Sequence, residues 1–168
     1  MRPDKAWFSA RVRENEASLY ALAMSYMKQE ADALDCVQQS ILKAYEHLDR
    51  LEDPGKFRAW MFGILVNCCR DELRRRKRVR VVEPGESEEP TVPDPSAATD
   101  TRTVLWSALD RLADPYRTVL LLFYYEDLST ADIAEVTGAG QSAVRKQLER
   151  GRALLKDELT KEGFSYED

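Results

Sequence analysis

The sequence predicts an all-α protein made of two small helical domains that are joined by a flexible, acidic, proline-rich linker. Apolar residues recur at helical spacing on both sides of the linker, and no segment alternates between apolar and polar residues as a half-buried strand would. The chain has 168 residues, of which 43% are hydrophobic and 33% are charged. This length and balance are typical of one ordinary globular domain or of two small ones.

The linker is expected at residues 81–100, VVEPGESEEPTVPDPSAATD, which contain four prolines, six acidic residues and no basic residue. Such a segment buries too little apolar surface to offset its ordering entropy. These residues carry a charge of −6, whereas the whole chain has a net charge of −5. The acidity of the whole chain therefore says little about the partners of the two domains beside the linker. We therefore expect domains at residues 1–80 and 101–160, and a short polar tail at 161–168.

The first domain is expected to contain three helices, at residues 5–28, 31–49 and 56–78, because apolar residues recur there at helical spacing. Asp53-Pro54-Gly55 interrupts the chain before the third helix. Two stripes run along that helix. The first is expected to face the core and contains Phe57, Met61, Ile64 and Cys68.

The second stripe contains Trp60, Gly63, Asn67, Arg70 and Arg74. It combines an aromatic ring, an amide and guanidinium groups, which suit base stacking, reading of a base edge and phosphate neutralisation. Arg74 to Arg78 then form five consecutive cations. A solvated helix end that complements the helix dipole is the alternative, but the dipole rewards each charge by only a few tenths of a kcal/mol, so an anionic partner is the better explanation. Trp60 considered alone is more often a core residue.

In the second domain, helices are expected at 101–112, from Pro115 to about Tyr125, from Ser129 or Thr130 to Val136, and from Gln141 to about Leu159. Asp114 is expected to cap the second of these, with Pro115 at its first position. Residues 115–126 are apolar nearly all round, which indicates either a buried core helix or a core helix that also docks another protein.

The stretch LSTADIAEVTGAGQSAVRKQLERGRALL predicts a helix-turn-helix, since Gly138 and Gly140 permit a sharp turn between a short helix and a longer basic one. Ile133, Ala134 and Val136 are expected to pack against Val144 and Leu148. The outward side of the second helix would then meet base edges, while Arg150 and Arg152 suit phosphates. An ordinary helical hairpin with a solvated charged face is the alternative. The candidate readers are Gln141, Ser142, Arg145, Lys146, Glu149 and Arg150.

Neither an enzyme nor a metalloprotein is expected. The three cysteines, Cys36, Cys68 and Cys69, do not suit a disulfide framework and are interpreted as small buried thiols. With a single histidine, His47, they do not supply a zinc site, and no cofactor or small-molecule substrate is indicated. No apolar run approaches the roughly 20 residues of a spanning helix, so we expect no membrane insertion and a cytoplasmic protein.

The order of these motifs resembles the extracytoplasmic-function (ECF) group of sigma-70 family RNA polymerase sigma factors, over nearly the whole chain. ADALDCVQQSILKAYEHLDRL resembles the second conserved region of that family. FRAWMFGILVNCCRDELRRRKR resembles its promoter-melting and minus-ten-reading helix, and the helix-turn-helix resembles its minus-thirty-five reader. The resemblance implies a sigma-2 domain at 1–80, a sigma-4 domain at 101–160 and a linker that threads toward the RNA exit path.

The resemblance also implies partners and site residues. Core RNA polymerase would meet Asp35, Gln38 and Gln39 through its clamp helices and residues 117–124 through its flap. Asn67 would contact a minus-ten base, and the loop 51–56 would receive a flipped base, whose binding offsets an extrusion cost of a few kcal/mol. An anti-sigma factor is a further expected partner. The minus-ten set is Trp60, Asn67, Arg70, Arg74 and Arg75.

Three positions depart from the family pattern. Gly63 stands where a basic residue is common, Gln147 where an arginine is frequent, and Ser142-Ala143 where Gly-Thr is often found. Phosphate contacts at the first two positions are therefore not assigned. The alternative hypothesis for the whole chain is a stand-alone helix-turn-helix transcriptional regulator, which would bind its operator without polymerase, usually as a dimer.

Overall fold

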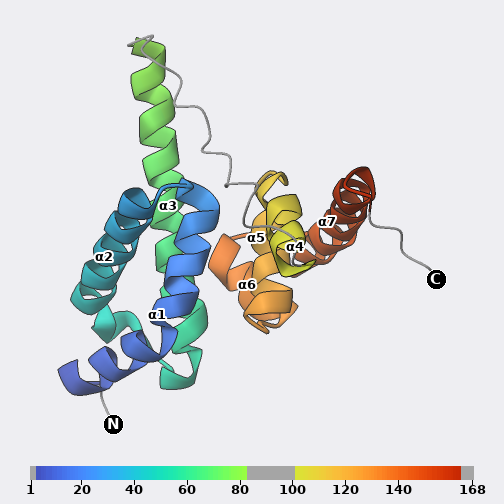
Figure 1. Cartoon of the computed structure of the whole chain (residues 1–168). Helices are drawn as coiled ribbons and strands as arrows, with labels where there is room; N and C mark the ends of the chain where they lie inside the picture. The colour runs from blue at the N-terminus through green and yellow to red at the C-terminus, as the bar shows by residue number, and fades with distance from the viewer. Residues whose placement is uncertain (1–2, 83–100, 164–168) are drawn as a thin grey trace. The chain divides into compact units, whose positions relative to one another are not determined.

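The computed structural model describes residues 3–82 and 101–163, and within these ranges all regular secondary structure is helical. The chain divides into two compact units. One is built around the N-terminal helices and also includes Ala134–Gly138, and the other is built around the remaining C-terminal helices. Figure 1 labels the main helices of both. The expected linker at 81–100 lies outside the described residues, except for its first two positions, which continue a helix.

The first unit contains three long helices that correspond to the three expected ones (Figure 1). Each packs against the other two. Asp4 caps the first of them by accepting a hydrogen bond of 2.8 Å from the Trp7 backbone N–H. The helices are α1 (Lys5–Met27), α2 (Glu30–Glu46) and α3 (Phe57–Val82), with single 3-10 turns at η1 (Leu48–Arg50) and η2 (Pro54–Lys56).

The buried face of α3 is wider than expected and includes residues outside the predicted core stripe. Phe57 and Met61 are buried as expected, but Ile64 and Cys68 are only half-buried. The expected core stripe was therefore wrong at these two positions. Because α3 packs against both α1 and α2, it buries residues on two adjoining stripes. The largest buried side chains that the stripe omitted are Phe62, Leu65, Val66 and Cys69.

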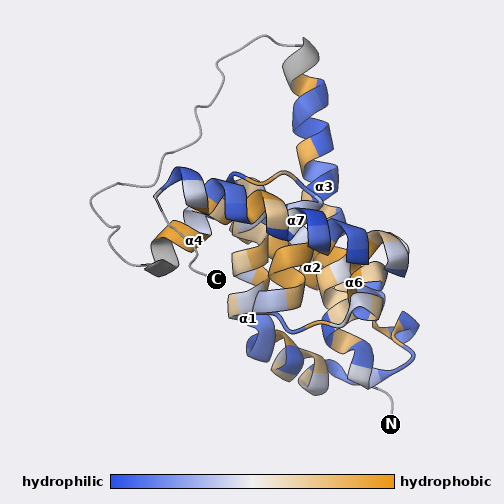
Figure 2. Cartoon of the chain, turned by 90° about the vertical axis from the view of Figure 1, so that its right-hand side faces the viewer, coloured by the Kyte–Doolittle hydropathy of each residue, from blue (hydrophilic) through white to orange (hydrophobic). Residues whose placement is uncertain are grey.

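The C-terminal part of α3 extends beyond α1 and α2 (Figure 1). Figure 2 shows that this extension is predominantly hydrophilic. The charged residues from Asp71 to Arg78 thus stand on the C-terminal part of a continuous helix, rather than on a loop. A protruding helix of this kind presents its side chains at fixed spacing to a partner.

The second unit places α5 and α4 against α7. Its expected helices are all present, but α5 begins at Tyr116 with Pro115 at the N-cap position, so the expected capping by Asp114 was wrong. The helical path then widens into a π-helical turn, η4. The elements are α4 (Thr101–Asp110), α5 (Tyr116–Leu120), η4 (Leu121–Tyr125), α6 (Thr130–Thr137) and α7 (Gln141–Lys161).

The contact between α5 and α7 is close because Gly151 faces Leu120. A Cβ atom at Gly151 would lie 3.2 Å from Leu120 Cδ1 and 3.6 Å from Tyr116 Cβ. Leu120, Val144 and Leu148 are buried around this contact. The position of α7 over α5 therefore depends on a residue without a side chain.

Candidate nucleic-acid interface

The second stripe of α3 is accessible from solvent. Asn67 and Arg74 are exposed, while Trp60 and Arg70 are half-buried. The ring of Trp60 lies 6.1 Å from that of Phe57, at an interplanar angle of 49°, so one edge of the indole is held against the core. The stripe therefore offers an anchored aromatic ring, an exposed amide and guanidinium groups along one face, in the order that the sequence indicated.

The cation run that follows is partly neutralised within the helix. Arg74 Nη1 lies 3.2 Å from Asp71 Oδ1, and Arg75 Nη2 lies 2.6 Å from Glu72 Oε1. Arg76 Nε donates to the same Glu72 oxygen at 3.0 Å. These i,i+3 and i,i+4 pairs offset the mutual repulsion of the arginines. Lys77 and Arg78 are exposed beyond them.

Arg76 also joins α3 to α2. Its Nη2 and Nη1 atoms lie 2.9 Å and 3.1 Å from the two carboxylate oxygens of Asp32, which is a bidentate contact. Such fork-to-fork pairs fix geometry as well as adding free energy. Arg76 therefore braces the base of the basic extension, whereas Arg74, Lys77 and Arg78 are more exposed to a partner.

The charges of this network persist across a wide pH range. Hydrogen bonds from Arg75 and then Arg76 lower the pKa of Glu72 from its usual 4.5 to about 2, against the opposing effect of burial. The hydrogen bond to Asp32 raises the pKa of the Arg76 guanidinium, and the contact with Glu72 raises that of Arg75. Glu72 and its two arginine partners are thus ionised at neutral pH.

The start of α3 is fixed to α1 by a second set of contacts. Arg58 Nε donates to Asn15 Oδ1 at 3.1 Å, and Asn15 Nδ2 donates to the Arg11 carbonyl at 2.8 Å. The Arg58 guanidinium carbon lies 5.3 Å from the centre of the Phe62 ring, in cation–π geometry. Arg58 therefore joins the first turn of α3 to α1.

The outer face of α2 carries the three expected polymerase contacts. Asp35, Gln38 and Gln39 are all exposed. The sequence reasoning missed that apolar side chains accompany them: Leu34 is 43% exposed, Leu42 is 65% exposed and Tyr45 is 47% exposed. Leu34, Gln38 and Leu42 follow at i, i+4 and i+8 and share one face. The signal was present, because Leu42 falls outside the core stripe of Ala33, Val37, Ile41 and Ala44.

The helix-turn-helix is formed by α6, the turn at Gly138 and α7. Ser129 Oγ caps α6 by accepting from the Asp132 N–H at 3.1 Å, and Gly138 adopts φ 77°, which glycine tolerates best. Ile133, Val144 and Leu148 are buried as expected, whereas Ala134 is half-buried. The turn that the glycine pair predicted is thus in place.

The outward side of α7 presents the expected reading residues. Six of its side chains are exposed, and Gln141 Nε2 donates to Thr130 Oγ1 at 2.9 Å, which ties the first residue of α7 to the first residue of α6. This bond orients the Gln141 amide at the N-terminal end of the helix. The exposed set comprises Gln141, Ser142, Arg145, Lys146, Glu149 and Arg150.

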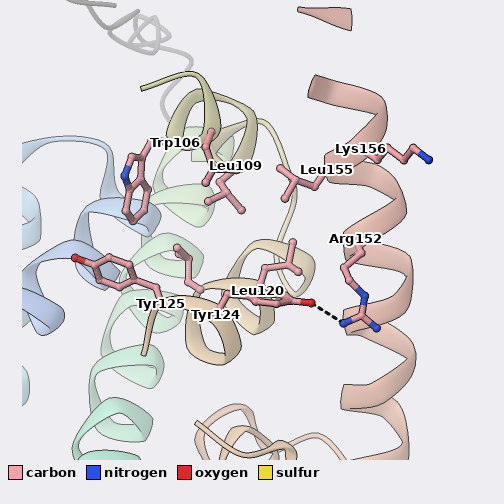
Figure 3. A pocket seen from close by; sticks show the side chains of 10 residues that line it. Trp106, Leu109, Leu120, Tyr124, Tyr125, Arg152, Leu155 and Lys156 are labelled. Atoms are coloured by element: carbon pink, nitrogen blue, oxygen red, sulfur yellow. Dashed lines mark hydrogen bonds between the residues drawn. The ribbon is translucent and has the colours of Figure 1, made fainter. Parts of the chain in front are cut away.

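Arg152 differs from the other cations of α7. Its Nη1 donates to the Tyr124 hydroxyl at 2.9 Å (Figure 3), so in this structure it is engaged with η4. Arg152 is also exposed and lines a groove in the second unit, and its expected phosphate contact stays a prediction.

That groove is apolar and has a volume of about 630 Å³. Trp106 and Tyr125 lie on the side of the groove opposite α7 in Figure 3. Their ring centres are 5.3 Å apart, and the rings meet edge to face at an interplanar angle of 75°. Of the expected flap-docking residues 117–124, Arg117 to Leu122 are buried, and Arg117 Nη1 donates to the Leu112 carbonyl at 2.8 Å. Tyr124 is the exposed residue of that range, so docking there would involve η4 rather than α5. The lining residues are Leu105, Trp106, Leu109, Leu120, Leu121, Tyr124, Tyr125, Arg152, Leu155 and Lys156.

The cysteines are free, and Cys36 and Cys69 are buried while Cys68 is half-buried. Burial raises the pKa of all three thiols, which disfavours the reactive thiolate. Among the described residues, no three metal-ligating side chains come together. The helices that the structure describes are each too short or too polar to cross a membrane.

Two family models match the chain, one on each unit. Sigma-70 region 2 matches residues 11–79, and sigma-70 region 4 matches residues 102–155. The first match contains the Trp60–Arg74 stripe and the outer face of α2. The second contains the helix-turn-helix and every residue that lines the apolar groove except Lys156. Both matched ranges end or begin next to the acidic segment 81–100.

Curated relatives resemble the chain over nearly its whole length. It is 35% identical over 161 residues to the RNA polymerase sigma factor SigV of Bacillus subtilis, which covers 96% of each chain. It is 30% identical over 167 residues to the ECF RNA polymerase sigma factor SigL of Mycobacterium tuberculosis, which covers 96% of this chain and 94% of that one.

Solved structures agree with these relatives. The sigma factor RpoE of Bartonella quintana, crystallised with the anti-sigma factor NepR, has a TM-score of 0.80 at 25% identity, and the match covers 91% of this chain and 96% of that chain. The structure of CnrH in complex with the cytosolic domain of CnrY has a TM-score of 0.67 at 27% identity and covers 94% of this chain and 90% of that chain.

Proposed function

Because the chain belongs to the extracytoplasmic-function group of the sigma-70 family, we propose that its two units read two separate elements of one promoter while they are bound to core RNA polymerase. As a sigma factor, the protein directs promoter-specific transcription initiation. The observation that carries the proposal is that both the region 2 and the region 4 family models match within one chain, on either side of a short acidic segment.

The first unit is assigned to the minus-ten element. The α3 stripe offers Trp60 for stacking, the exposed Asn67 amide for a base edge, and Arg70 and Arg74 for phosphates. Arg75 belongs to the same set. To bind a phosphate, its guanidinium must either contact Glu72 and the phosphate together or release Glu72. The loop 51–56 is exposed except for Leu51, which supports its assignment to a flipped base.

The second unit is assigned to the minus-thirty-five element. Arg145 and Lys146, with Gln141, Ser142 and Glu149, lie on the N-terminal half of α7, which is the half that enters the major groove in helix-turn-helix proteins. Arg150 lies farther along and suits a phosphate, which positions the protein without specifying sequence.

Core polymerase is assigned to two surfaces. Asp35, Gln38 and Gln39 on α2, together with the exposed Leu34 and Leu42, form a mixed polar and apolar face for the clamp helices. An interface of this kind has an apolar centre and a polar rim. The flap is assigned to η4 and the apolar groove beside it. We place the protein in the cytoplasm, where polymerase acts, and infer no catalytic activity.

An anti-sigma factor is a further proposed partner, because one similar solved structure holds the sigma factor RpoE with the anti-sigma factor NepR, and another holds CnrH with the cytosolic domain of CnrY. By analogy, such an inhibitor would cover the surfaces that polymerase needs. The alternative of a stand-alone regulator is not favoured, since region 2 and region 4 both match and relatives that cover nearly the whole chain are sigma factors.

The experiment is run-off transcription with the purified full chain, core polymerase and a library of genomic fragments. We expect discrete starts that require both the chain and the core enzyme, and weak DNA binding by the chain alone. Absence of any start across the library, together with a tight footprint on a palindrome without polymerase, would instead establish the stand-alone regulator.

A further inference from the structure

The first side chain of α7 is tied to the first side chain of α6. Gln141 Nε2 donates a hydrogen bond of 2.9 Å to Thr130 Oγ1, which is the usual length for a bond of this type. Gln141 is exposed, whereas Thr130 is half-buried. A long polar side chain on the outward face of the helix-turn-helix is therefore held by a residue of the neighbouring helix.

Both ends of this contact stand on formed helical turns. The Ser129 carbonyl accepts from the Ile133 N–H at 2.9 Å at the start of α6. The Gly140 carbonyl accepts from the Val144 N–H at 3.0 Å at the start of α7. Because Thr130 is β-branched, its side chain also has few accessible rotamers. Thr130 thus supplies an acceptor at a defined place beside the first residue of α7.

The bond limits what the Gln141 amide can offer to a base. A free glutamine amide has two N–H hydrogens and one carbonyl oxygen. Thr130 uses one of these hydrogens, so one hydrogen and the carbonyl oxygen of Gln141 remain. The exposed amide therefore presents one donor and one acceptor, rather than two donors and one acceptor.

Adenine is the base whose major-groove edge matches this remaining pair of groups. It presents the N7 acceptor next to the N6 amino donor, so both groups of the amide are satisfied. Guanine presents two acceptors, N7 and O6, and the Gln141 carbonyl oxygen would face one of them without a hydrogen between. Cytosine and thymine each present a single hydrogen-bonding group. The bond to Thr130 thus withdraws the second hydrogen that an unrestrained amide would offer to guanine.

The Gln141 amide is close to another candidate reader. Gln141 and Arg145 are four residues apart, are both exposed, and share one face of α7. Four residues rise about 6 Å along a helix, which is close to two base-pair steps of about 3.4 Å. The base that Gln141 meets should therefore lie within about two steps of the base that Arg145 meets.

We propose that Gln141 selects adenine in the element that α7 reads, and that Thr130 is the positioning residue behind this selection. Thr130 holds the hydrogen that points away from the Gln141 carbonyl oxygen, while the other hydrogen bonds to adenine N7 and the oxygen accepts from adenine N6. Because the side chain is oriented beforehand, less of its rotamer freedom is lost on binding. This inference rests on the proposed function, since it requires α7 to lie in the major groove.

The contact itself is tested by NMR of the full chain without DNA, with the side-chain amide resonances of Gln141 as the reporter. Gln141→Ala assigns these resonances by their loss. We expect Thr130→Val, which keeps the shape of the side chain but lacks the hydroxyl, to shift them, whereas Thr130→Ser keeps them near the wild-type position. Thr160→Val is the matched control, because it makes the same change at the other end of α7 and should leave them in place.

The selection is tested by competition binding of the polymerase complex to duplexes with each base at each minus-thirty-five position. The wild type should prefer adenine at one position by about 5- to 150-fold, and Gln141→Ala should abolish that preference there alone. Thr130→Val should narrow the gap between adenine and guanine at the same position by about two- to tenfold, and Thr130→Ser should restore it. In the Gln141→Ala background, Thr130→Val should have no further effect at this position.

Three results would overturn the inference. The first is a set of Gln141 amide resonances that Thr130→Val leaves unchanged. The second is a preference for a base other than adenine at the position that depends on Gln141. The third is a Thr130→Val variant that weakens binding to all sequences alike, since a merely structural role would have that effect.

Failure of the proposed function gives a different result. If run-off transcription yields no start, the same variants are compared by selection from randomised duplexes with the full chain alone. Low salt is used there, because it strengthens binding to the phosphate backbone. A stand-alone regulator also places its recognition helix in the major groove, so the dependence of adenine selection on Gln141 and Thr130 can still be measured.

Discussion

Arg76 in α3 and Asp32 in α2 are joined by two contacts, of 2.9 Å and 3.1 Å, at the level where α3 leaves the body of the first unit. α3 continues beyond Arg76 to Val82 and carries the exposed Lys77 and Arg78 there. The pair therefore adds a bidentate ionic contact to the packing of α2 against α3, just before these cations.

Replacing Asp32 by asparagine should lower the free energy of unfolding by about 1–2 kcal/mol, because one charge-assisted bidentate contact is lost while Arg76 stays partly solvated. Urea denaturation measures this. Asp35→Asn is the matched control on the exposed face of the same helix and should change stability by less than about 0.5 kcal/mol. Equal effects of the two substitutions would show that the pair is not a brace.

Glu72 should make the stability of the folded protein depend on pH between about 4.5 and 2. Its pKa is about 2 when folded and 4.5 ordinarily, so the unfolded chain binds more protons between these values. Its stabilisation is present above pH about 4.5 and is lost as the pH falls toward 2. Urea midpoints between pH 6 and pH 2.5 should therefore fall less steeply for Glu72→Gln than for the wild type, and parallel curves would contradict the assignment.

The two asparagines should have opposite phenotypes. Asn67→Ala should impair discrimination among minus-ten sequences with little loss of stability, because its side chain is exposed. Asn15→Ala should lower stability by about 1–3 kcal/mol and leave promoter choice intact, since it removes a buried amide bonded to Arg11 and Arg58. In vitro transcription on minus-ten variants and thermal unfolding separate the two, and unchanged start-site choice in Asn67→Ala would remove that residue from the reading set.

Arg145 and Arg150 test the division between base and phosphate contacts on α7. Arg145→Ala should relax preference at one position of the minus-thirty-five element by about 1–3 kcal/mol. Arg150→Ala should weaken binding to all sequences alike and lower the salt dependence. Competition binding by the polymerase complex across single-base variants measures both. Uniform losses for Arg145→Ala would reassign it to phosphate.

The helices and their order could be predicted from the sequence because each begins or ends at a local signal. The Asp53-Pro54-Gly55 break, the Ser129 cap and the Gly138 turn act within a few residues, and all three are present. The start of α5 was predicted less accurately, because an Asp-Pro pair suits either a helix cap or a turn before the helix. The π-helical widening at η4 was not predicted, because it depends on tertiary packing that has no local sequence signal.

The site was predicted as a set of residues but not as a set of contacts. Helical spacing sufficed to place Trp60, Asn67 and Arg74 on one face, since that spacing is a property of the helix alone. The pairing of Arg76 with Asp32 spans 44 positions, and the engagement of Arg152 by Tyr124 spans 28. Pairings of this range depend on how helices cross, so the sequence did not distinguish bracing arginines from those open to DNA.

The glycine at position 151 has a consequence for how the protein could be altered. Even one methyl group there would press on Leu120 at 3.2 Å, which is closer than most real contacts of this type. The packing of α7 on α5 thus depends on the absence of a side chain at Gly151. A larger side chain at this site would have to displace Leu120, so substitutions on the exposed face of α7 should disturb the packing of this helix less than substitutions at Gly151.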